Sequence, residues 1–450
     1  MLDRRIIPHP ENFSEIIYPE INKFTLKSGP EVYHIQKSKL PLITLIFFIP
    51  GGSKFDPAGK EGIGFLNSML IDEGAGGLSG LELSDRLTST GSALAINTTA
   101  DELEFSLLAL KENFESTLEI ASKVFFEPSY SLNDFNREKS KLLNGIIQNN
   151  KYPAVVAEKF FRQHISGVNN AYCHSLFGSL ESTGNITHDE ILNYYTNFVK
   201  GRKPVFVVTG DIDTNELSLL LEKYFPAERL TQDKLSNPEI KFEKTKSKLI
   251  LVDFPGAPQA EIIMGFPRGP RNERTYYTEK LLNTIFGGSF NSRLNMNLRE
   301  REGYTYGISS NFSYKQQMSN FVISTGVDNN NAGNAIYQIL QELKLMKEEE
   351  VTPEELKDAK DMVIRKFPLS FETYSATASA LYLLAALDLP LDYYKKFVER
   401  IDEVKAGDIQ FLANDVFDLD SILIVVAGNR NEISDSLEGN FTGEVIEVSI

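Results

Sequence analysis

An internal repeat constrains the fold of this 450-residue chain more than any other feature of its sequence. The segments IFFIPGG and IIMGFPRG match each other, and so do THDEILNYYTNFVKGRKPVFVVTGD and KAGDIQFLANDVFDLDSILIVVAGN. The matched residues Gly51 and Gly269, Ile191 and Ile409, and Gly210 and Gly428 are each 218 positions apart. A constant offset at both ends of a long stretch indicates that one structural unit of about 220 residues occurs twice.

The repeat sets the predicted domain boundaries. The join falls within AERLTQDKLSNPEIKFEKTKSK, which is polar and charged and has no apolar periodicity, as expected of a linker. We therefore predict a first domain over residues 1–228, a linker over 229–248 and a second domain over 249–450. Strand patterns alternate with long helical patterns in each half. The predicted class is α+β, with helices packed on one face of a mixed, mostly antiparallel sheet.

The first half contains the clearest strand and helix patterns. The run PLITLIFFIP is continuously apolar, which is typical of a buried strand, and PVFVVTG has the same character. In GIGFLNSMLIDE, apolar residues recur at helical spacing, and Ile63, Leu66 and Leu70 are expected to face the core. Further helices are predicted over 81–89, 111–126, 131–150, 154–164 and 187–199, and two strands across 93–110.

The stretch FGGSFNSRLNMNLREREGYTYGISS contains the best candidates for chemistry. Its first part favours a helix that Gly303 would end, and Tyr304 to Phe312 has the β-branched and aromatic residues of a strand. Arg299 and either Tyr304 or Tyr306 would then project from neighbouring elements. Both side chains can donate hydrogen bonds to an oxygen that gains negative charge. The alternative is that the arginine caps the helix end and the tyrosine lies at a strand edge.

Written as GGSF-x-SRL-x-x-x-LRE-x-x-GYTYG, this stretch resembles the second-half signature of the pitrilysin, insulinase and mitochondrial-processing-peptidase family of zinc metallopeptidases. The resemblance implies two copies of that family's α+β unit, spanning nearly all of the chain. It also implies an arginine and a tyrosine that reach a zinc site in another domain and hold the substrate and its tetrahedral intermediate. The matching residues are Arg299 and Tyr306, with Tyr304 as the second choice if the alignment shifts.

The zinc ligands of that family have no counterpart at the matching positions. Catalytic members carry His-x-x-Glu-His on a helix, where two histidines on one face bind Zn²⁺ and the glutamate polarises the metal-bound water. Aligning the helix that begins at Gly62 places Phe65, Ser68 and Met69 at these positions, and the third ligand falls at Gly145. None of these side chains serves as a zinc ligand of this type. No two histidines lie three or four apart on one helix among His9, His34, His164, His174 and His188.

No other catalytic set stands out. The chain has no Gly-x-Ser-x-Gly elbow, and its one cysteine, Cys173, cannot form an internal disulfide or a cysteine metal cluster. Neighbouring side chains point to opposite sides of a strand, so Cys173 and His174 are not expected to act as nucleophile and base. We interpret Cys173 as a small packed residue. The acidic groups, Asp72 with Glu73 and Asp101 with Glu102 and Glu104, are interpreted as solvated helix ends or turns.

The charge balance limits the kinds of partner. A net charge of −16 and a pI near 5.0 argue against nucleic acid or an anionic membrane surface and favour a basic or neutral peptide. No apolar run approaches the length of a membrane span, and the start MLDRRIIPHPENF lacks the apolar core of a signal peptide. The expected location is cytoplasmic, or periplasmic if a leader has been removed.

Together these features predict the non-zinc subunit of a heterodimeric peptidase that is inactive alone. Within the family it resembles, such a chain supplies the arginine and tyrosine in trans, while a homologous partner binds zinc and the pair cleaves unfolded peptides. We therefore expect no cofactor in this chain and zinc in the partner subunit. Two alternatives remain open. The chain is a non-enzymatic core subunit of a larger assembly, or a peptide-binding protein that holds extended peptides at an edge strand over 93–100.

Overall fold

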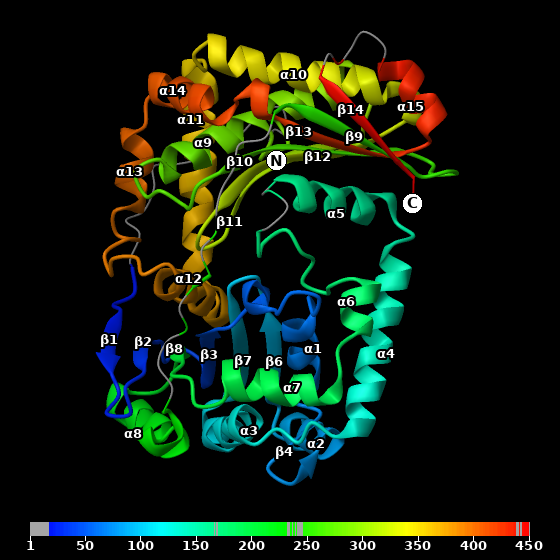
Figure 1. Ribbon diagram of the computed structural model, residues 1–450. Helices are drawn as coiled ribbons and strands as arrows, with labels where there is room; N and C mark the ends of the chain where they lie inside the picture. The colour runs from blue at the N-terminus through cyan, green and yellow to red at the C-terminus, as the bar shows by residue number, and fades with distance from the viewer. Residues whose placement is uncertain are drawn as a thin grey trace, which may run out of the picture.

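Two six-stranded sheets, one in each half of the chain, form the framework of the protein (Figure 1). The computed structural model describes residues 18–165, 167, 170–231, 235, 237–238, 240, 246–437, 441 and 443–449. In Figure 1 the first half of the chain fills the lower part of the molecule and the second half the upper part. The architecture is the predicted mixed arrangement of two sheets and many helices.

The first sheet has the strand order β1-β2-β8-β3-β7-β6. Strands β2 and β8 run parallel, and the other neighbours are antiparallel. The strands are β1 (Asn22–Thr25), β2 (Glu31–Gln36), β3 (Leu42–Pro50), β6 (Ala93–Thr98), β7 (Glu102–Leu110) and β8 (Val205–Gly210). A separate two-stranded hairpin is formed by β4 (Gly74–Ala75) and β5 (Leu78–Ser79).

The second sheet has the order β11-β12-β10-β13-β9-β14. Its strands are β9 (Lys248–Asp253), β10 (Ala260–Arg268), β11 (Ile308–Tyr314), β12 (Ser319–Val327), β13 (Leu423–Gly428) and β14 (Glu444–Ser449). Strands β10 and β13 lie 218 positions after β3 and β8 at both ends of each strand, as the repeat requires. The outermost strands differ, because β14 runs parallel to β9 whereas β1 runs antiparallel to β2.

Helices pack on the sheet in each half of the chain. The first half contains α1 (Ile63–Leu70), α2 (Gly80–Ser89), α3 (Phe114–Phe126), α4 (Leu132–Asn149), α5 (Pro153–Ile165), α6 (Leu180–Gly184), α7 (His188–Tyr194) and α8 (Thr214–Tyr224). The second half contains α9 (Tyr276–Phe286), α10 (Ala332–Glu348), α11 (Pro353–Lys366), α12 (Tyr374–Ala386), α13 (Phe397–Glu403), α14 (Ala406–Val416) and α15 (Arg430–Leu437).

Short local signals set where these helices begin. Ser79, Thr187 and Thr352 each accept a hydrogen bond from the backbone three residues later, and the side chain at that position returns to the cap. Such capping boxes satisfy backbone donors that the first helical turn leaves unpaired. Helix α1 instead uses the carboxylate of Asp56, which accepts from the backbone N–H groups of Gly62 at 2.8 Å and Gly64 at 3.1 Å.

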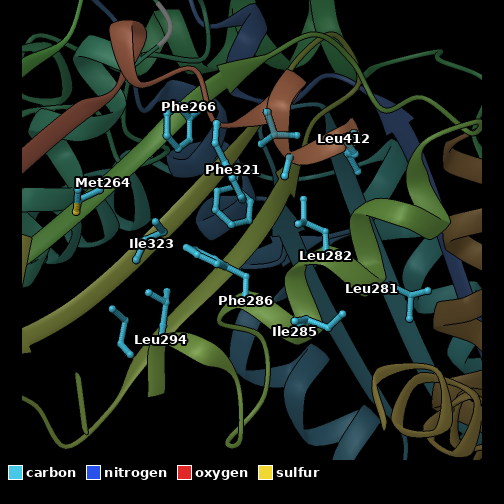
Figure 2. Packing of buried hydrophobic residues seen from close by; sticks show 14 of the residues in the cluster. Met264, Phe266, Leu281, Leu282, Ile285, Phe286, Leu294, Phe321, Ile323 and Leu412 are labelled. Atoms are coloured by element: carbon cyan, nitrogen blue, oxygen red, sulfur yellow. The ribbon is translucent and has the colours of Figure 1, made fainter. Parts of the chain in front are cut away.

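Each half has an aromatic core between its sheet and its helices. In the first, the ring of Phe47 stacks on Phe105 at 4.5 Å and meets Phe225 edge-on at 5.3 Å. In the second, Figure 2 shows Phe286 of α9 beside Phe321 of β12, with 5.9 Å between ring centroids. Both clusters are fully shielded from solvent, so burial of apolar area is the main source of their stability.

The opposite face of each sheet is covered by a helix from the other half of the chain. Successive residues of a strand point to opposite faces. Phe47 therefore faces its own core, whereas Phe48 meets Tyr382 of α12 at 5.0 Å between ring centroids. Helix α5 reciprocates, since its Phe161 packs in a cluster with Ile263 of β10. The predicted arrangement, with helices on one face, lacked this exchange of helices.

The start of one predicted strand differs from the structure, and most of the predicted linker lies outside the described residues. The strand expected from Tyr304 begins only at Ile308, so that prediction was wrong. Gly303 has a φ of +68°, and the chain between it and Ile308 is irregular, which separates the π-helix Asn295–Arg301 from β11. Much of the predicted linker 229–248 lies outside the described residues. The proposed domain limits 1–228 and 249–450 therefore stay a prediction, although β9 already begins at Lys248.

Candidate functional site

The positions that match a metal helix are filled by side chains that pack. Phe65 and Met69 of α1 lie partly buried against the first core, and the ring of Phe65 meets Phe177 edge-on at 4.6 Å. The Ser68 hydroxyl is buried and donates to the carbonyl of Phe65 at 2.8 Å. The fourth position, Gly145 on α4, faces open space, because a Cβ there would meet nothing within 4 Å.

The α1 corner is the segment Asp56–Glu73 together with the loop at Phe177. Its described residues hold no metal-binding arrangement of carboxylates and imidazoles. Among the described residues, no group of three His, Cys, Asp or Glu side chains could hold a metal ion. The nearest ionisable group that follows α1 is Asp72, whose pKa burial raises to about 6, with Glu73 and Glu138 adding to the shift. Because a zinc ligand must be deprotonated and must converge with others, this single carboxyl does not make a site.

The start of α1 is fixed by close approach of the loop that carries Phe177. Gly62 has a φ of +99°, and a Cβ there would lie 2.6 Å from the Phe177 carbonyl oxygen. Asp56, which caps this turn, is buried enough for its pKa to rise to about 7 despite the two backbone donors. The α1 corner is therefore a packed structural unit.

The signature, which is the stretch from Gly287 to Gly307, is anchored by buried residues of the second half. Leu294 and Leu298 are fully buried in the second core. The amide of Asn295 donates to the Ile308 carbonyl at 2.8 Å and its oxygen accepts from the Ile308 N–H at 3.3 Å. These contacts hold the π-helix against the first residue of β11.

Arg299 lies on the outer side of this π-helix. Its guanidinium carbon is 3.5 Å from the centroid of the Phe290 ring, and a guanidinium nitrogen is 2.8 Å from a carboxylate oxygen of Glu300. The side chain is 14% exposed, while the Phe290 residue is 71% exposed. A guanidinium stacked on a ring keeps hydrogen-bond donors free in its plane. Arg299 is thus held in place by Phe290 and Glu300, with a small part of its side chain open to solvent.

The two tyrosines differ strongly. Tyr304 is half-buried against the second core, and its N–H donates to the Leu298 carbonyl at 2.9 Å. Tyr306 is 96% exposed, and its phenol makes no hydrogen bond with another described residue. The structure therefore brings Arg299 together with Phe290 and leaves Tyr306 projecting from the same loop. Neither Arg299 nor Tyr306 lines the two cavities discussed below.

A buried polar cluster lies between the two halves, and local sequence patterns did not indicate it. This cluster, called the seam, consists of Lys54, Asp101, Glu102, Tyr172, Gln316 and Tyr382. Lys54 donates to Asp101 at 2.9 Å and to the side-chain oxygen of Gln316, in the β11–β12 turn, at 2.8 Å. The Tyr172 hydroxyl donates to the same Asp101 oxygen at 2.5 Å. Lys54 and Asp101 are almost fully buried, so this ion pair is largely shielded from solvent and salt.

Glu102 continues the seam. Its carboxylate accepts from the Gln316 side chain at 3.2 Å and from the hydroxyl of Tyr382 on α12. Burial raises the pKa of Glu102 to about 7, although the hydrogen bond from Tyr382 opposes the rise. The interpretation of Asp101 and Glu102 as solvated was therefore wrong. Two of their partners, Gln316 and Tyr382, lie more than 200 positions away, which local sequence patterns do not reveal.

Cys173 and His174 do interact, contrary to the prediction. They lie in a turn, where side-chain directions no longer alternate as in a strand. Burial is the largest single influence and would raise the pKa of Cys173, but the hydrogen bond and charge of His174 together with backbone hydrogen bonds outweigh it, and the pKa is lowered. The His174 Nε2 atom is 3.9 Å from a carboxylate oxygen of Glu61, and these three residues line a cavity of about 70 Å³.

The duplicated α+β unit, with Phe65 and Met69 packed at positions matched to zinc ligands, defines the class of this protein as a homologue of the metallopeptidases with this duplicated unit. Residues 32–171 match the family described as Insulinase (Peptidase family M16), and residues 185–363 match the one described as Peptidase M16 inactive domain. The chain belongs to the M16, or insulinase, family of peptidases, as a member without the zinc-binding residues.

Three relatives illustrate this assignment. The chain is 22% identical to the non-peptidase homolog YmxG of Helicobacter pylori, over 93% of this chain and 95% of the relative. It is 21% identical to a Bacillus subtilis protein named as uncharacterized zinc protease YmxG, over 91% and 99%. A crystal structure of a peptidase M16 inactive domain from Pseudomonas fluorescens has a TM-score of 0.84 at 21% identity, covering 91% of this chain and 98% of that one.

None of the described helices is both long enough and apolar enough to cross a membrane.

Proposed function

We propose that this protein is the zinc-free subunit of a two-chain M16 peptidase and that it offers Arg299 and Tyr306 to a peptide held at a homologous partner's zinc. The observation that carries this proposal is a contrast within the chain. The metal positions Phe65 and Met69 are packed into the core, whereas the phenol of Tyr306 is 96% exposed and makes no hydrogen bond with a described residue.

The chemistry of the signature supports a role at an oxygen that becomes negative. A guanidinium and a phenol are both donors, and charge-assisted donation strengthens as negative charge develops on the scissile carbonyl oxygen. Removing one such donor typically costs about 3 kcal/mol of transition-state stabilisation, or on the order of a hundredfold in rate. Arg299 is already oriented by Phe290 and Glu300, so little ordering would be needed when a substrate arrives.

The surface around these groups suits a protein partner. Phe290, Met296 and Tyr306 are all more than a third exposed on one short stretch of chain, beside the arginine. Aromatic residues, methionine and arginine are enriched at the centres of protein interfaces. A partner that covers this stretch would bury apolar surface and place its own zinc near the two donors.

The edge of the first sheet offers a place for the peptide itself. Strand β6 is outermost in the sheet and pairs on one side only, with β7. An extended peptide can add to such an edge through backbone hydrogen bonds. The edge strand therefore supports binding of the peptide substrate by the zinc-free subunit as well as by its partner.

The test is reconstitution with a zinc-bearing M16 chain. The purified protein is expected to bind no stoichiometric zinc and to cleave no peptide. The pair is expected to bind zinc and to cleave peptide. Arg299→Ala should lower kcat of the pair about a hundredfold without dissociating it. Arg301→Ala is the matched control, because Arg301 lies in the same π-helix but its side chain is 62% exposed and, among the described residues, pairs only with Glu302.

Tyr306→Phe should lower kcat in the same direction, with Tyr337→Phe on α10 as the control for loss of an exposed phenol. If Arg299→Ala changed the melting temperature of the pair but left turnover intact, the protein would be a core subunit without a catalytic role. Hydrolysis of peptides by the lone chain with one tightly bound zinc would overturn the proposal outright.

A further inference from the structure

A second cavity lies in the second half of the chain, and neither Arg299 nor Tyr306 is among its lining residues. It has a volume of about 620 Å³ and is lined by α9, α11, α12, the 3₁₀ turn Phe367–Phe371, the start of α13 with the chain before it, and Gly288 of the signature. A cavity of this volume lies within the range of small-molecule sites. The ring side chains on its walls are Tyr276, Phe367, Tyr393, Tyr394 and Phe397.

The side chains that form the walls of this cavity, called the groove from here on, are held by contacts with one another and with neighbouring residues. The rings of Phe367 and Phe397 stack at 4.2 Å, and the Tyr394 hydroxyl donates to the Ala380 carbonyl at 2.6 Å. The Tyr393 hydroxyl accepts from Arg271 at 2.8 Å. A ligand that enters does not have to order these side chains, which lowers the free-energy cost of binding.

The groove is positively charged in an acidic protein. Lys280 and Lys366 are the charged residues among its described lining, and none of the lining residues is acidic. Neither lysine forms a salt bridge with another described residue. Because the chain as a whole carries −16, this local excess of positive charge indicates an anionic ligand.

The elements that line the groove favour an alkyl chain over a peptide. They are helices and turns, whose backbone N–H and C=O groups are largely bonded within the helices, and no strand contributes a lining residue. A peptide in this groove would bury its own backbone polar groups without partners. An alkyl chain has no such groups, and it would lie along the rings with its carboxylate at the lysines.

We propose that this groove binds a long-chain carboxylate, with the headgroup at Lys280 and Lys366 and the alkyl chain against the aromatic walls. The proposal does not depend on the zinc-free peptidase role. Each methylene buried in an apolar site adds about fourfold to affinity. A charged headgroup paired with two ammonium groups adds further affinity that a neutral ester would lack.

Calorimetric titration of the full chain with saturated carboxylates of increasing length, each below its micelle concentration, tests the proposal. Affinity should rise severalfold for each methylene added and should drop at least tenfold for the methyl ester of the same chain. The double variant Lys280→Ala and Lys366→Ala should lose at least tenfold, whereas Lys357→Ala should not, since Lys357 lies on α11 outside the groove.

A steric variant provides the second measurement. Ser379→Phe places a ring in the groove from α12 and should abolish binding, while Ser375→Phe on an exposed part of the same helix should not. Melting temperatures identify any variant that fails to fold, and the control variants keep the result interpretable. No measurable binding, affinity independent of chain length, or equal binding by Ser379→Phe would overturn the proposal. So would tighter binding of an acidic peptide than of the carboxylate series.

Discussion

The α1 corner of the first half and the signature of the second half differ in where their side chains go. In the α1 corner, Leu66 is fully buried and Phe65 packs on Phe177. In the signature, buried Leu294 and Leu298 hold a loop whose outward side chains, Phe290 and Tyr306, are exposed. The first arrangement contributes to folding and the second contributes little beyond its anchors. Phe65 and Met69, at positions matched to metal ligands, are thus packed, while the signature exposes the Phe290 ring and the Tyr306 phenol to solvent.

The largest expected effect is on the packed side of this comparison. Leu66→Ala should lower the free energy of unfolding by about 3 kcal/mol, because it removes buried methyl groups and leaves a cavity under α1. Urea unfolding followed by circular dichroism measures the change. A loss below about 1 kcal/mol would show that the α1 corner can collapse around the cavity and is less rigid than the contacts indicate.

The next effect concerns Glu102, at the seam between the two regions. Its pKa is raised from an ordinary 4.5 to about 7 in the folded protein, mainly by burial. Between these values the folded state keeps a proton that the unfolded state has released, so stability falls as the pH rises through this window. Ionisation of Glu102 should cost the wild type roughly 3 kcal/mol of its free energy of unfolding between pH 4.5 and pH 8, and Glu102→Gln should not show that loss.

Urea unfolding at pH 5 and pH 8 measures the effect of Glu102→Gln, with Glu112→Gln on the surface as the control. Some decrease with pH should persist in the variant, because burial also raises the pKa of Asp56 to about 7. Parallel stability profiles for the wild type and Glu102→Gln would show that this carboxyl is ionised in the folded protein.

A smaller effect is expected at the edge of the α1 corner. The hydrogen bond with His174 lowers the pKa of Cys173, so the thiol should be alkylated by iodoacetamide at a lower pH than an ordinary thiol. His174→Gln should shift the pH midpoint of the reaction upward. Since Cys173 is the one cysteine of the chain, intact mass gives the rate directly. The same midpoint in both proteins would mean that His174 has no influence on the thiol.

The smallest effect is expected on the exposed side. Phe290→Ala and Tyr306→Phe should each change the free energy of unfolding by less than about 0.5 kcal/mol, because both residues are solvated and the phenol has no described partner. The same denaturation assay applies. A loss above about 1 kcal/mol for either variant would show that the signature contributes to the fold, and the contrast with α1 would disappear.

Much of the fold followed from the sequence because it depends on local patterns. The continuous apolar runs identified β3 and β8, and the offset of 218 placed β10 and β13 at the matching positions. The exchange of α5 and α12 did not follow, since nothing in an amphipathic helix states which sheet it will cover. Gly265 shows the constraint in retrospect, because a Cβ there would lie 2.8 Å from the ring of Phe161.

The site was predictable in part. The sequence indicated which side chains stand where zinc ligands would be, and Phe65 and Met69 do pack as apolar residues do. It did not indicate that Tyr304 and Tyr306 lie in an irregular loop, because β-branched and aromatic residues favour strands until tertiary contacts decide otherwise. The buried pairing of Lys54 with Asp101 was also hidden, since charged residues in a turn are usually solvated.

The exchange of helices between the halves has a consequence for cooperativity. Phe161 of α5 and Tyr382 of α12 each belong to one half in sequence and to the other in packing. Neither half can melt without stripping a helix from its neighbour, so heating should produce one calorimetric transition in place of two. Cleavage of the chain between the halves should likewise give two fragments that stay together until both unfold.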